Sequence, residues 1–300
     1  MADGPVFGYD TWWGFGLQAA GQPKTAASLT NYWPLSADEG LKLERMIRLL
    51  DFADYRGYQT KWLSMGTYGA GTIQFPLIPG VVSNLLTWIQ DRATEDDNQG
   101  RSATVVFNLD QIQKRFVGTK VRTATFDFTK NEVVQATLDV ASLIGEDDAT
   151  AYTPAVTATS PYIFTQAAFT YPDTTTDFDY VEGAQVVIDN VLETPEDGFR
   201  GDGGPYPACM YNLHGIRATG FLEMEFRSDD DWDRFRQGTE IATKIVCTSG
   251  ANTCTLTMPR LIVMTDPVQM PGKHDVRLKA RVEFTALGSA DGTTAPITLS

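Results

Sequence analysis

The sequence is poor in the residues from which disulfide frameworks and metal sites are built. Among 300 residues there are three cysteines and two histidines. An odd and sparse cysteine count does not make a disulfide framework. The five residues (Cys209, Cys247, Cys254, His214 and His274) also show no spacing typical of metal ligands. We therefore expect reduced thiols and no metal or other cofactor.

Long apolar runs are also missing. No stretch approaches the roughly 20 apolar residues that a membrane-spanning helix needs. The first residues, MADGPVFGYDTWWGFG, lack the basic segment and the apolar segment of a secretory signal. These absences predict a protein that is made in a cytoplasm, stays soluble there and has no membrane partner.

Positive charge is scarce. The chain has 24 basic and 38 acidic residues, a formal net charge of −14, and no Lys/Arg cluster. A protein that grips nucleic acid through its phosphates needs a basic patch. Specific nucleic-acid binding is therefore not expected. An acidic protein can still work beside DNA if its task is to avoid sticking to it.

Motifs of catalysis are absent as well. The glycine-rich GTYGAG at 66–71 lacks the GxGxxG spacing and the helix that should follow it, and neither a GxSxG nor a Walker A sequence occurs. The acidic runs do not match a calcium loop. His214 has no serine or cysteine motif nearby and is interpreted as structural. The sequence predicts a protein that is not an enzyme, with a hydrolase built on an unfamiliar Asp/Glu pair as the alternative.

What the sequence does contain is strict alternation of apolar and polar residues. In VRTATFDFTKNEVVQATLDV (121–140), two alternating runs flank a short turn at 129–132. Because successive side chains of a strand point to opposite faces, this pattern predicts an antiparallel hairpin with one apolar face and one polar face. The apolar face is explained as core. The role of the polar face needs another explanation.

Similar patterns predict most of the other elements. Helical spacing predicts a helix over 80–91, with Val81, Leu85, Trp88 and Ile89 on one face, and another over 228–238, which Gly238 ends. The pattern over 41–50 does not separate helix from strand. Strands are predicted over 71–78, 103–109, 112–117, 184–193, 217–227 and 276–287, with a further hairpin around 248–253.

Each half of the chain follows the order strand, helix, strands, hairpin. This order predicts a degenerate tandem duplication of a small α+β unit dominated by antiparallel sheet. The polar, Pro-containing stretch around 145–161 suggests the boundary. We expect an extended N-terminal arm over 1–34, a first unit over 35–148, a linker over 149–160 and a second unit over 161–300.

The N-terminal arm and two further segments are candidates for contacts between subunits. Aromatic side chains of the arm are costly to leave in water, so they cover either the same subunit or a neighbour. The segment 54–70 and the glycine-rich loop 196–212 are the other candidates. The residues proposed for these contacts are Trp12, Trp13, Trp33, Trp62, Tyr68, Phe199 and Tyr206.

The strand segments carry a resemblance to a known family. KRFVGTKVRTATFDFTKNEVVQATLDV (114–140), EGAQVVIDNVLETPEDGF (182–199), GIRATGFLEMEF (215–226) and PRLIVMTDPVQMPGKHDVRLKARVEFTAL (259–287) follow one another in an order that resembles the major tail tube proteins of long-tailed, siphophage-type bacteriophages. The resemblance covers most of residues 35–290, and its motifs are structural ones.

This resemblance implies a tail-tube fold: β-sandwich or half-barrel sheets with a short flanking helix, closing into a β-barrel ring on oligomerisation. It implies a structural virion protein whose stacked rings form the tail tube, the conduit through which genomic DNA is ejected. The implied partners are further copies of the chain, the tape measure protein and DNA in the lumen, and tail terminator and tail-tip proteins at the two ends. Assembly would take place in the host cytoplasm.

In that setting the polar faces of the strands line either the lumen or the outside of the tube. Carboxylates and hydroxyls on the lumen would leave DNA phosphates unbound. The alternative for each residue is a strand face that is merely wetted by solvent. The candidate lumen residues are Thr123, Thr125, Asp127, Gln135, Thr137, Asp139, Glu223, Glu225 and Glu283.

Two questions stay open from the sequence. If each chain supplies two units, a ring of six units needs three chains, a trimer with pseudo-hexameric symmetry; a true hexamer is the alternative. The competing function is a carbohydrate-binding or host-binding β-sandwich of a tail or cell surface, with Tyr58, Trp62 and Tyr206 as sugar platforms.

Overall fold

The structure is a computed structural model of the whole chain. It describes residues 11–19, 22–34, 40–53, 59–90, 101–109, 112–155, 159–199, 205–210, 215–226, 229–269, 279–288 and 295–300. Antiparallel strands dominate this part of the chain, and two α-helices accompany them. The predicted class, α+β with mainly antiparallel sheet, is confirmed.

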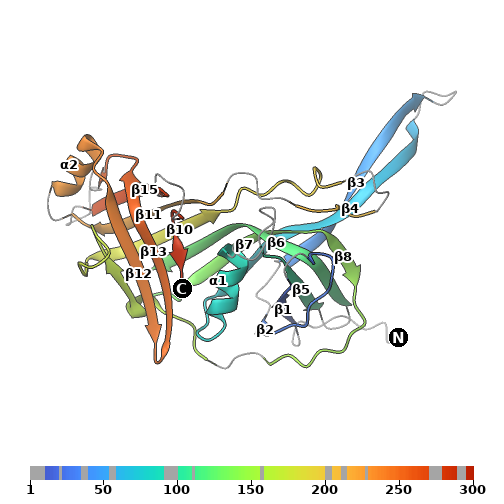
Figure 1. The fold of residues 1–300 in the computed structure, drawn as a ribbon, viewed down its shortest axis with the longest axis horizontal. Helices are drawn as coiled ribbons and strands as arrows, with labels where there is room; N and C mark the ends of the chain where they lie inside the picture. Colours follow the sequence, from blue (N-terminus) through green and yellow to red (C-terminus); the bar gives the residue numbers. More distant parts are fainter. Residues whose placement is uncertain are drawn as a thin grey trace.

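The main sheet runs through both halves of the chain (Figure 1). Its strands lie side by side in the order β3-β4-β7-β6-β10-β11-β15, and β13, continued by β14, follows β15. Every pairing in it is antiparallel. Their bounds are β3 Gly40–Ala53, β4 Gln59–Pro76, β7 Gln135–Ser142, β6 Ile112–Thr129, β10 Val181–Asp189, β11 Arg217–Glu225, β15 Lys279–Ala286, β13 Asn252–Val263 and β14 Val268–Gln269.

Further strands pair with the N-terminal parts of β6 and β13. β2-β1-β5 extend from one side of β6, and β8 lies on its other side. In the second half, β9-β12 extend from one side of β13 and β16 lies on the other. The bounds are β1 Thr11–Leu17, β2 Asn31–Pro34, β5 Ala103–Leu109, β8 Ile144–Asp147, β9 Ala167–Thr170, β12 Ile241–Ser249 and β16 Thr298–Leu299.

A continuous apolar core packs against one face of the main sheet. Along β6 and β7 the alternate side chains Ala124, Phe126, Ala136 and Leu138 are fully buried in it. Helix α1 (Val82–Gln90) covers this side of the sheet in the first half, and the Nε1 of Trp88 donates a 3.0 Å hydrogen bond to the carbonyl of Thr119. The opposite face of the main sheet is therefore the one left to solvent.

The order of connections is the same in the two halves. In the first, β3 and β4 pair, α1 follows, β5 and β6 form a hairpin, and β7 inserts between β6 and β4. In the second, β10 and β11 pair, α2 (Asp230–Gln237) follows, β12 and β13 form a hairpin, and β15 inserts between β13 and β11. β1 and β9 occupy matching places beside β5 and β12, as do β8 and β16 beside β6 and β13.

The predicted N-terminal arm is wrong for the residues that the structure describes. β1 pairs with β5 along its whole length, and β2 pairs with β1. The apolar side chains of β1 and β2 lie in the core, where the Trp13 and Trp33 rings stack at 4.7 Å. An extended arm would have left these large aromatic surfaces in water, and adding two strands to the sheet removes them.

Strand lengths also differ from the prediction. The stretch over 41–50, which the pattern left open, belongs to β3, and β4 begins well before the predicted strand at 71–78. Together they form a long hairpin that projects from the body (Figure 1). β6 is one strand of 18 residues rather than two short ones. The short-range patterns missed this because a β-bulge at 121–123 shifts the alternation.

The helices and the second hairpin follow the prediction closely. α1 buries Val82, Leu85, Trp88 and Ile89 in the core. α2 ends at Gly238, whose φ of 64° is the left-handed conformation that glycine adopts readily. In the β12–β13 hairpin, Ser249 lies opposite Asn252, so the turn is where the sequence placed it.

Candidate functional site

The nine predicted lumen residues lie on one face of the main sheet. In the register of the strands, Thr125 is opposite Thr137 of β7 on one side and Val187 of β10 on the other. The residues between them along each strand are buried in the core, so these side chains point the other way. We call this surface the polar face; the predicted residues on it are Thr123, Thr125, Asp127, Gln135, Thr137, Asp139, Glu223, Glu225 and Glu283.

Hydrogen bonds link the polar face across the strands. Gln185 of β10 donates a 2.6 Å bond from its Nε2 to Oδ1 of Asp127, and Gln74 of β4 donates a 3.4 Å bond to Oε1 of Gln135. Both link residues of neighbouring strands. The face is thus an ordered polar surface shared by both halves of the chain.

The polar face carries positive as well as negative charge. Arg281 of β15 forms ion pairs with Glu223 at 2.9 Å and with Glu283 at 3.1 Å, and its guanidinium lies 3.7 Å from the centre of the Phe221 ring. Sequence reasoning missed Arg281, although the alternation of KARVEF places it on the same side as Glu283. Glu223 and Glu283 are therefore partly neutralised.

Two acids of this region have shifted pKa values, in opposite directions. Partial burial raises the pKa of Asp139, and the nearby Arg122 guanidinium, at 3.5 Å, opposes that shift. Hydrogen bonds from Lys279 and Lys130 lower the pKa of Glu182, which lies 3.0 Å and 3.2 Å from the two ammonium groups. Glu182 therefore stays ionised and links β10 to β15 and to the turn after β6.

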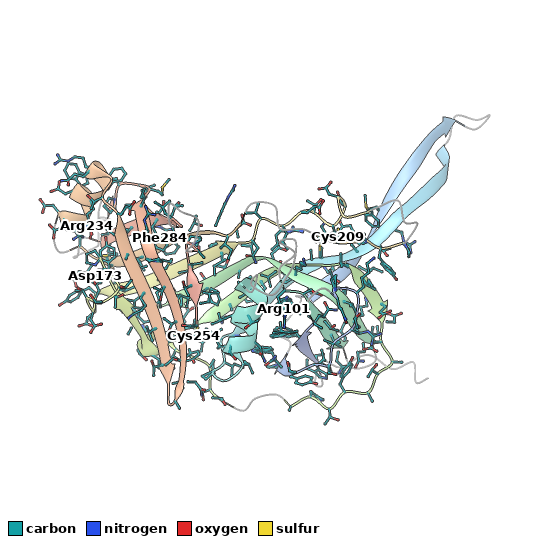
Figure 2. The ribbon with its side chains drawn as sticks, viewed as in Figure 1. Arg101, Asp173, Cys209, Arg234, Cys254 and Phe284 are labelled. Carbon is teal, nitrogen blue, oxygen red and sulfur yellow. The ribbon has the colours of Figure 1, made fainter. Side chains whose placement is uncertain are left out.

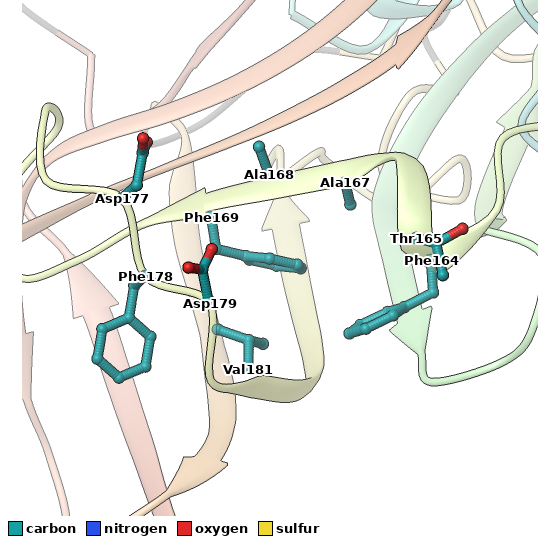
Figure 3. Close-up of a pocket in the computed structure, with 9 residues that line it drawn as sticks. All are labelled: Phe164, Thr165, Ala167, Ala168, Phe169, Asp177, Phe178, Asp179 and Val181. Carbon is teal, nitrogen blue, oxygen red and sulfur yellow. The ribbon is translucent and has the colours of Figure 1, made fainter. Parts of the chain in front are cut away.

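A pocket beside β9 does not have the features of a catalytic site. It has a volume of about 290 Å³. Figure 3 shows the rings of Phe164 and Phe169 extending toward each other. Their centres lie 5.8 Å apart, and Asp177 and Asp179 also line the pocket. Its lining offers two carboxylates but no nucleophile with a base.

The described residues form neither of two other kinds of site. No group of His, Cys, Asp and Glu side chains there is arranged to hold a metal ion. Among the helices that the structure describes, none has the length and apolar character needed to cross a membrane.

Comparison with known proteins identifies the family. The sequence profile of the family described as phage tail tube protein matches residues 8–286, nearly the whole chain. The chain belongs to the phage tail tube protein family. It is therefore a structural component of the virion tail. No curated protein matches the chain.

For this tail tube protein, the structure places three of the predicted subunit contacts inside the core. Trp12, Trp13 and Trp33 are 7%, 1% and 0% exposed. Trp12 packs edge-on against Tyr32 and Tyr152 of the same chain. Of the two alternatives given by the sequence, covering their own subunit or docking on a neighbour, the structure shows the first.

Two other predicted contact residues, Tyr68 and Phe199, link the base of the β3–β4 hairpin to the loop after β10. The hydroxyl of Tyr68 donates a 2.6 Å hydrogen bond to Glu44, and it lies 3.2 Å from Glu196 of the loop after β10. The Phe199 ring of that loop packs against Gly66, where an added Cβ would collide with it. Tyr206 is half-buried, and the side chain of Trp62 lies outside the described residues, as does Tyr58.

A buried lysine that sequence reasoning did not single out fixes the same loop. Lys120 is 3% exposed, and its ammonium donates a 2.8 Å hydrogen bond to the carbonyl of Met210. The backbone N–H of Thr67 also bonds to the carbonyl of Pro205 at 2.9 Å. The described parts of the loop that the sequence suggested for contacts between subunits, 196–199 and 205–210, are therefore held against the β3–β4 hairpin and β6 of their own tail tube subunit.

The structure joins none of the three cysteines of this tail tube protein in a disulfide. Cys247 and Cys254 lie opposite each other across the β12–β13 hairpin, and both are fully buried. Figure 2 marks Cys254 near the turn end of the hairpin. Burial raises the pKa of Cys254 to about 12, so almost no thiolate is present at neutral pH. His214 and His274 lie outside the described residues.

Proposed function

We propose that copies of this chain close into rings whose main sheets form one continuous β-barrel, and that stacked rings make the conduit for genome ejection. The observation that carries the proposal is the main sheet itself: one polar face, one core face and two open edges, β3 and β14, among the described strands. An open edge invites pairing with another chain, and closing the sheet into a barrel removes it.

Two tube units per chain favour a ring of three chains. The repeated order of connections supports a tandem duplication, with β1 included in the first unit. Counting β13 and β14 as one strand, the main sheet has eight strands in each chain. Three copies give roughly 24 strands, and a barrel of that size is about 45–50 Å across at the backbone. A hexamer of this chain, the alternative, would double that width.

The polar face is proposed as the lumen wall. Its hydroxyls, amides and paired charges offer DNA phosphates few free cations, because Arg281 is bound by Glu223 and Glu283. Binding to phosphate through counterion release needs unpaired Lys or Arg. DNA and the tape measure protein would therefore pass with little retention, without catalysis by the wall.

Stacking of rings is assigned to the projecting β3–β4 hairpin. The strand β4 has 18 residues, which corresponds to about 60 Å. The hairpin leaves the body of the subunit (Figure 1), and the loop with Phe199 and Tyr206 supports its base. Trp62, Tyr68, Phe199 and Tyr206 remain the proposed contact residues, with terminator and tip proteins meeting the end rings.

Electron microscopy of the purified chain tests this proposal. We expect hollow tubes, and end-on averages with three-fold symmetry and six similar lobes. Strict six-fold symmetry with twelve lobes would replace the trimer by the hexamer. A chain that stays monomeric at high concentration, without tubes in any buffer, would overturn the proposed assembly.

A further inference from the structure

We propose that neighbouring copies join by antiparallel pairing of Gly40–Lys42 at the edge of β3 in one copy with Ile262–Met264, the last two residues of β13 and the residue after it, in the next. This inference rests on the proposed function and specifies the strands and the register of its joint. A joint of this kind is already present inside the chain, where the first half of the main sheet meets the second along β6 and β10.

The internal joint pairs the late part of β6 with β10. Asp189 of β10 lies opposite Thr123, and the pairing continues to Gly183 opposite Thr129. The earlier part of β6 is occupied on this side by β5, whose pairing ends with Ala103 opposite Thr119. On this side, the first part of β6 therefore pairs with its hairpin partner β5, and the last part pairs with β10, the first strand of the second half's main sheet.

In the second half, β13 corresponds to β6. It also pairs first with its hairpin partner, here β12, but no described strand takes the place that β10 takes beside β6. The pairing of β13 with β12 ends with Ile241 opposite Leu261. Beyond Leu261, β13 and β14 pair with β15 on one side, and no described strand lies on the other. The position that β10 takes beside β6 is therefore open beside the end of β13.

The strand that matches β10 is β3, and its outer side is open as well. β3 pairs with β4 and with no other described strand. In a closed ring, β3 of the next copy is therefore the equivalent of β10. The open side of β13 and the open side of β3 are the two edges of one repeated joint.

The internal joint also sets the register. One row of residues crosses four neighbouring strands of it. Thr72 of β4 is opposite Asp139 of β7, Asp139 is opposite Thr123 of β6, and Thr123 is opposite Asp189 of β10. Asp189 in turn pairs with Arg217 of β11.

The same row in the second half leads to Ile262. There Thr219 of β11, Thr285 of β15 and Ile262 of β13 lie opposite one another. With Thr219 as the equivalent of Thr72, Arg217 is the equivalent of Ala70, because each lies two residues earlier in its strand. Arg217 pairs with Asp189 and Ala70 pairs with Lys42, so Lys42 is the equivalent of Asp189. Lys42 of the next copy therefore takes the place of Asp189, opposite Ile262.

Side-chain burial agrees with this register. The pairing places Leu41 opposite Val263, and the two are 5% and 6% exposed on the core side of their strands. The corresponding internal pair, Ile188 and Ala124, is also buried on the core side. A register shifted by one residue would set a core-facing side chain opposite a polar-face one.

Exposed apolar side chains at both edges give independent support. Met264 is 57% exposed and directly follows β13, and Leu43 is 47% exposed on β3, next to the paired residues. Large apolar side chains at an open strand edge favour association. The joint brings both edges out of water, and a second copy of this chain is the partner that supplies the complementary strand.

Disulfide trapping in the full-length chain tests the joint. Lys42→Cys and Ile262→Cys are combined, because directly opposite residues of an antiparallel pair have Cα atoms within the range that a disulfide can bridge. The matched control combines Lys42→Cys with Thr285→Cys, which lies on the same face but one strand further away. That distance, about 10 Å, is too long for a disulfide.

We expect assembled tubes of the first variant, once oxidised, to give a covalent ladder on a denaturing gel that stops at the number of copies in a ring. The control and the two single variants should remain monomers on the same gel. Tubes that form normally but do not link, or that link equally in the control, overturn this joint and leave the proposed function standing. Absence of tubes from the unsubstituted chain overturns both.

Hydrogen exchange on the unsubstituted chain gives a readout that needs no variant. Assembly should protect the outward-facing amides within Leu41–Leu43 and Ile262–Thr265 against exchange, because strand pairing gives these amides hydrogen-bond partners. The amide of Met264 already donates to the carbonyl of Glu283 at 2.8 Å and should change little. Assembled tubes in which these two segments exchange as fast as in the free subunit would contradict the joint.

Discussion

Gln185 and Asp127 are joined by a 2.6 Å hydrogen bond across the line where β10 meets β6. The bond lies on the polar face, at the seam between the two halves of the chain. Because the donor and the acceptor belong to different halves, the seam is an internal example of the contact by which separate copies would join. Its strength can be measured in the free subunit.

A double-mutant cycle with Gln185→Ala and Asp127→Ala should give a coupling energy of about 1 kcal/mol in urea unfolding, the range of a hydrogen bond that includes a charged acceptor near solvent. Asp127→Ala combined with Thr248→Ala, at the far end of β12, serves as the control cycle. Those two changes share no contact and should be additive within about 0.5 kcal/mol. Additivity in the Gln185 cycle would show that the bond contributes nothing.

The ion pairs of Glu182 predict a dependence of stability on pH. Lys279 and Lys130 hold the pKa of the folded Glu182 below its unfolded value, so this glutamate stabilises the fold above its unfolded pKa. The stabilisation is lost as pH falls through the folded pKa. Glu182→Gln should therefore cost about 0.5 kcal/mol at neutral pH, a value limited by solvent screening, and nothing in acid.

Urea unfolding at neutral pH and at a pH where glutamates are protonated measures this difference. Glu132→Gln, on the exposed turn between β6 and β7, removes the same charge and controls for net charge alone. Equal unfolding energies for Glu182→Gln and the unsubstituted chain at neutral pH would rule out a stabilising role for these pairs.

Local patterns in the sequence were sufficient for most elements and for the polar face. Alternation placed Thr123, Thr125 and Asp127 opposite Gln135 and its neighbours, and helical spacing found α1, because both signals lie within a dozen residues. Pairing between distant strands carries no such signal. The insertion of β7 between β6 and β4, and of β15 between β13 and β11, became visible only in the structure.

The N-terminal segment shows why the rest could not be predicted. TWWGFGL has tryptophans and glycines rather than clean alternation, and five of its seven residues are buried. A strand covered on both sides loses the polar half of the pattern. Arg281 shows a different limit: alternation places it on the polar face, but its pairing with Glu223 depends on which strand lies beside β15, and the sequence pattern does not give that.

The aromatic stack of the N-terminal strands should contribute strongly to the free energy of unfolding of the subunit. Trp33 is fully buried and stacks on Trp13 and Phe15. Trp33→Ala should cost about 3–5 kcal/mol in the free energy of unfolding, as expected for removal of a buried aromatic ring. Unfolding of the free subunit, followed by circular dichroism, measures the cost.

Trp232→Ala is the matched control for that change. Trp232 is 38% exposed on α2, beside Arg236, and its truncation should cost less than about 1 kcal/mol. If Trp33→Ala left the stability of the subunit unchanged but prevented assembly, the tryptophan would act between subunits, as an arm would.

The lumen assignment predicts what an added charge does to DNA passing through the tube. Thr125 lies in the middle of the polar face, between Thr137 and Val187. Thr125→Lys would place one unpaired cation per chain on the wall, repeated in every ring. Tubes of this variant should retain double-stranded DNA, with a retention that falls steeply as salt increases.

Thr248→Lys provides the comparison, because Thr248 is an exposed threonine on β12, away from the polar face. Its tubes should let DNA pass as the unsubstituted tubes do, since the added charge lies outside the lumen. Capture of labelled DNA by immobilised tubes across a salt series measures the difference. Equal capture by the two variants would place the polar face on the outside of the tube, because a cation on the lumen wall meets every phosphate that passes it.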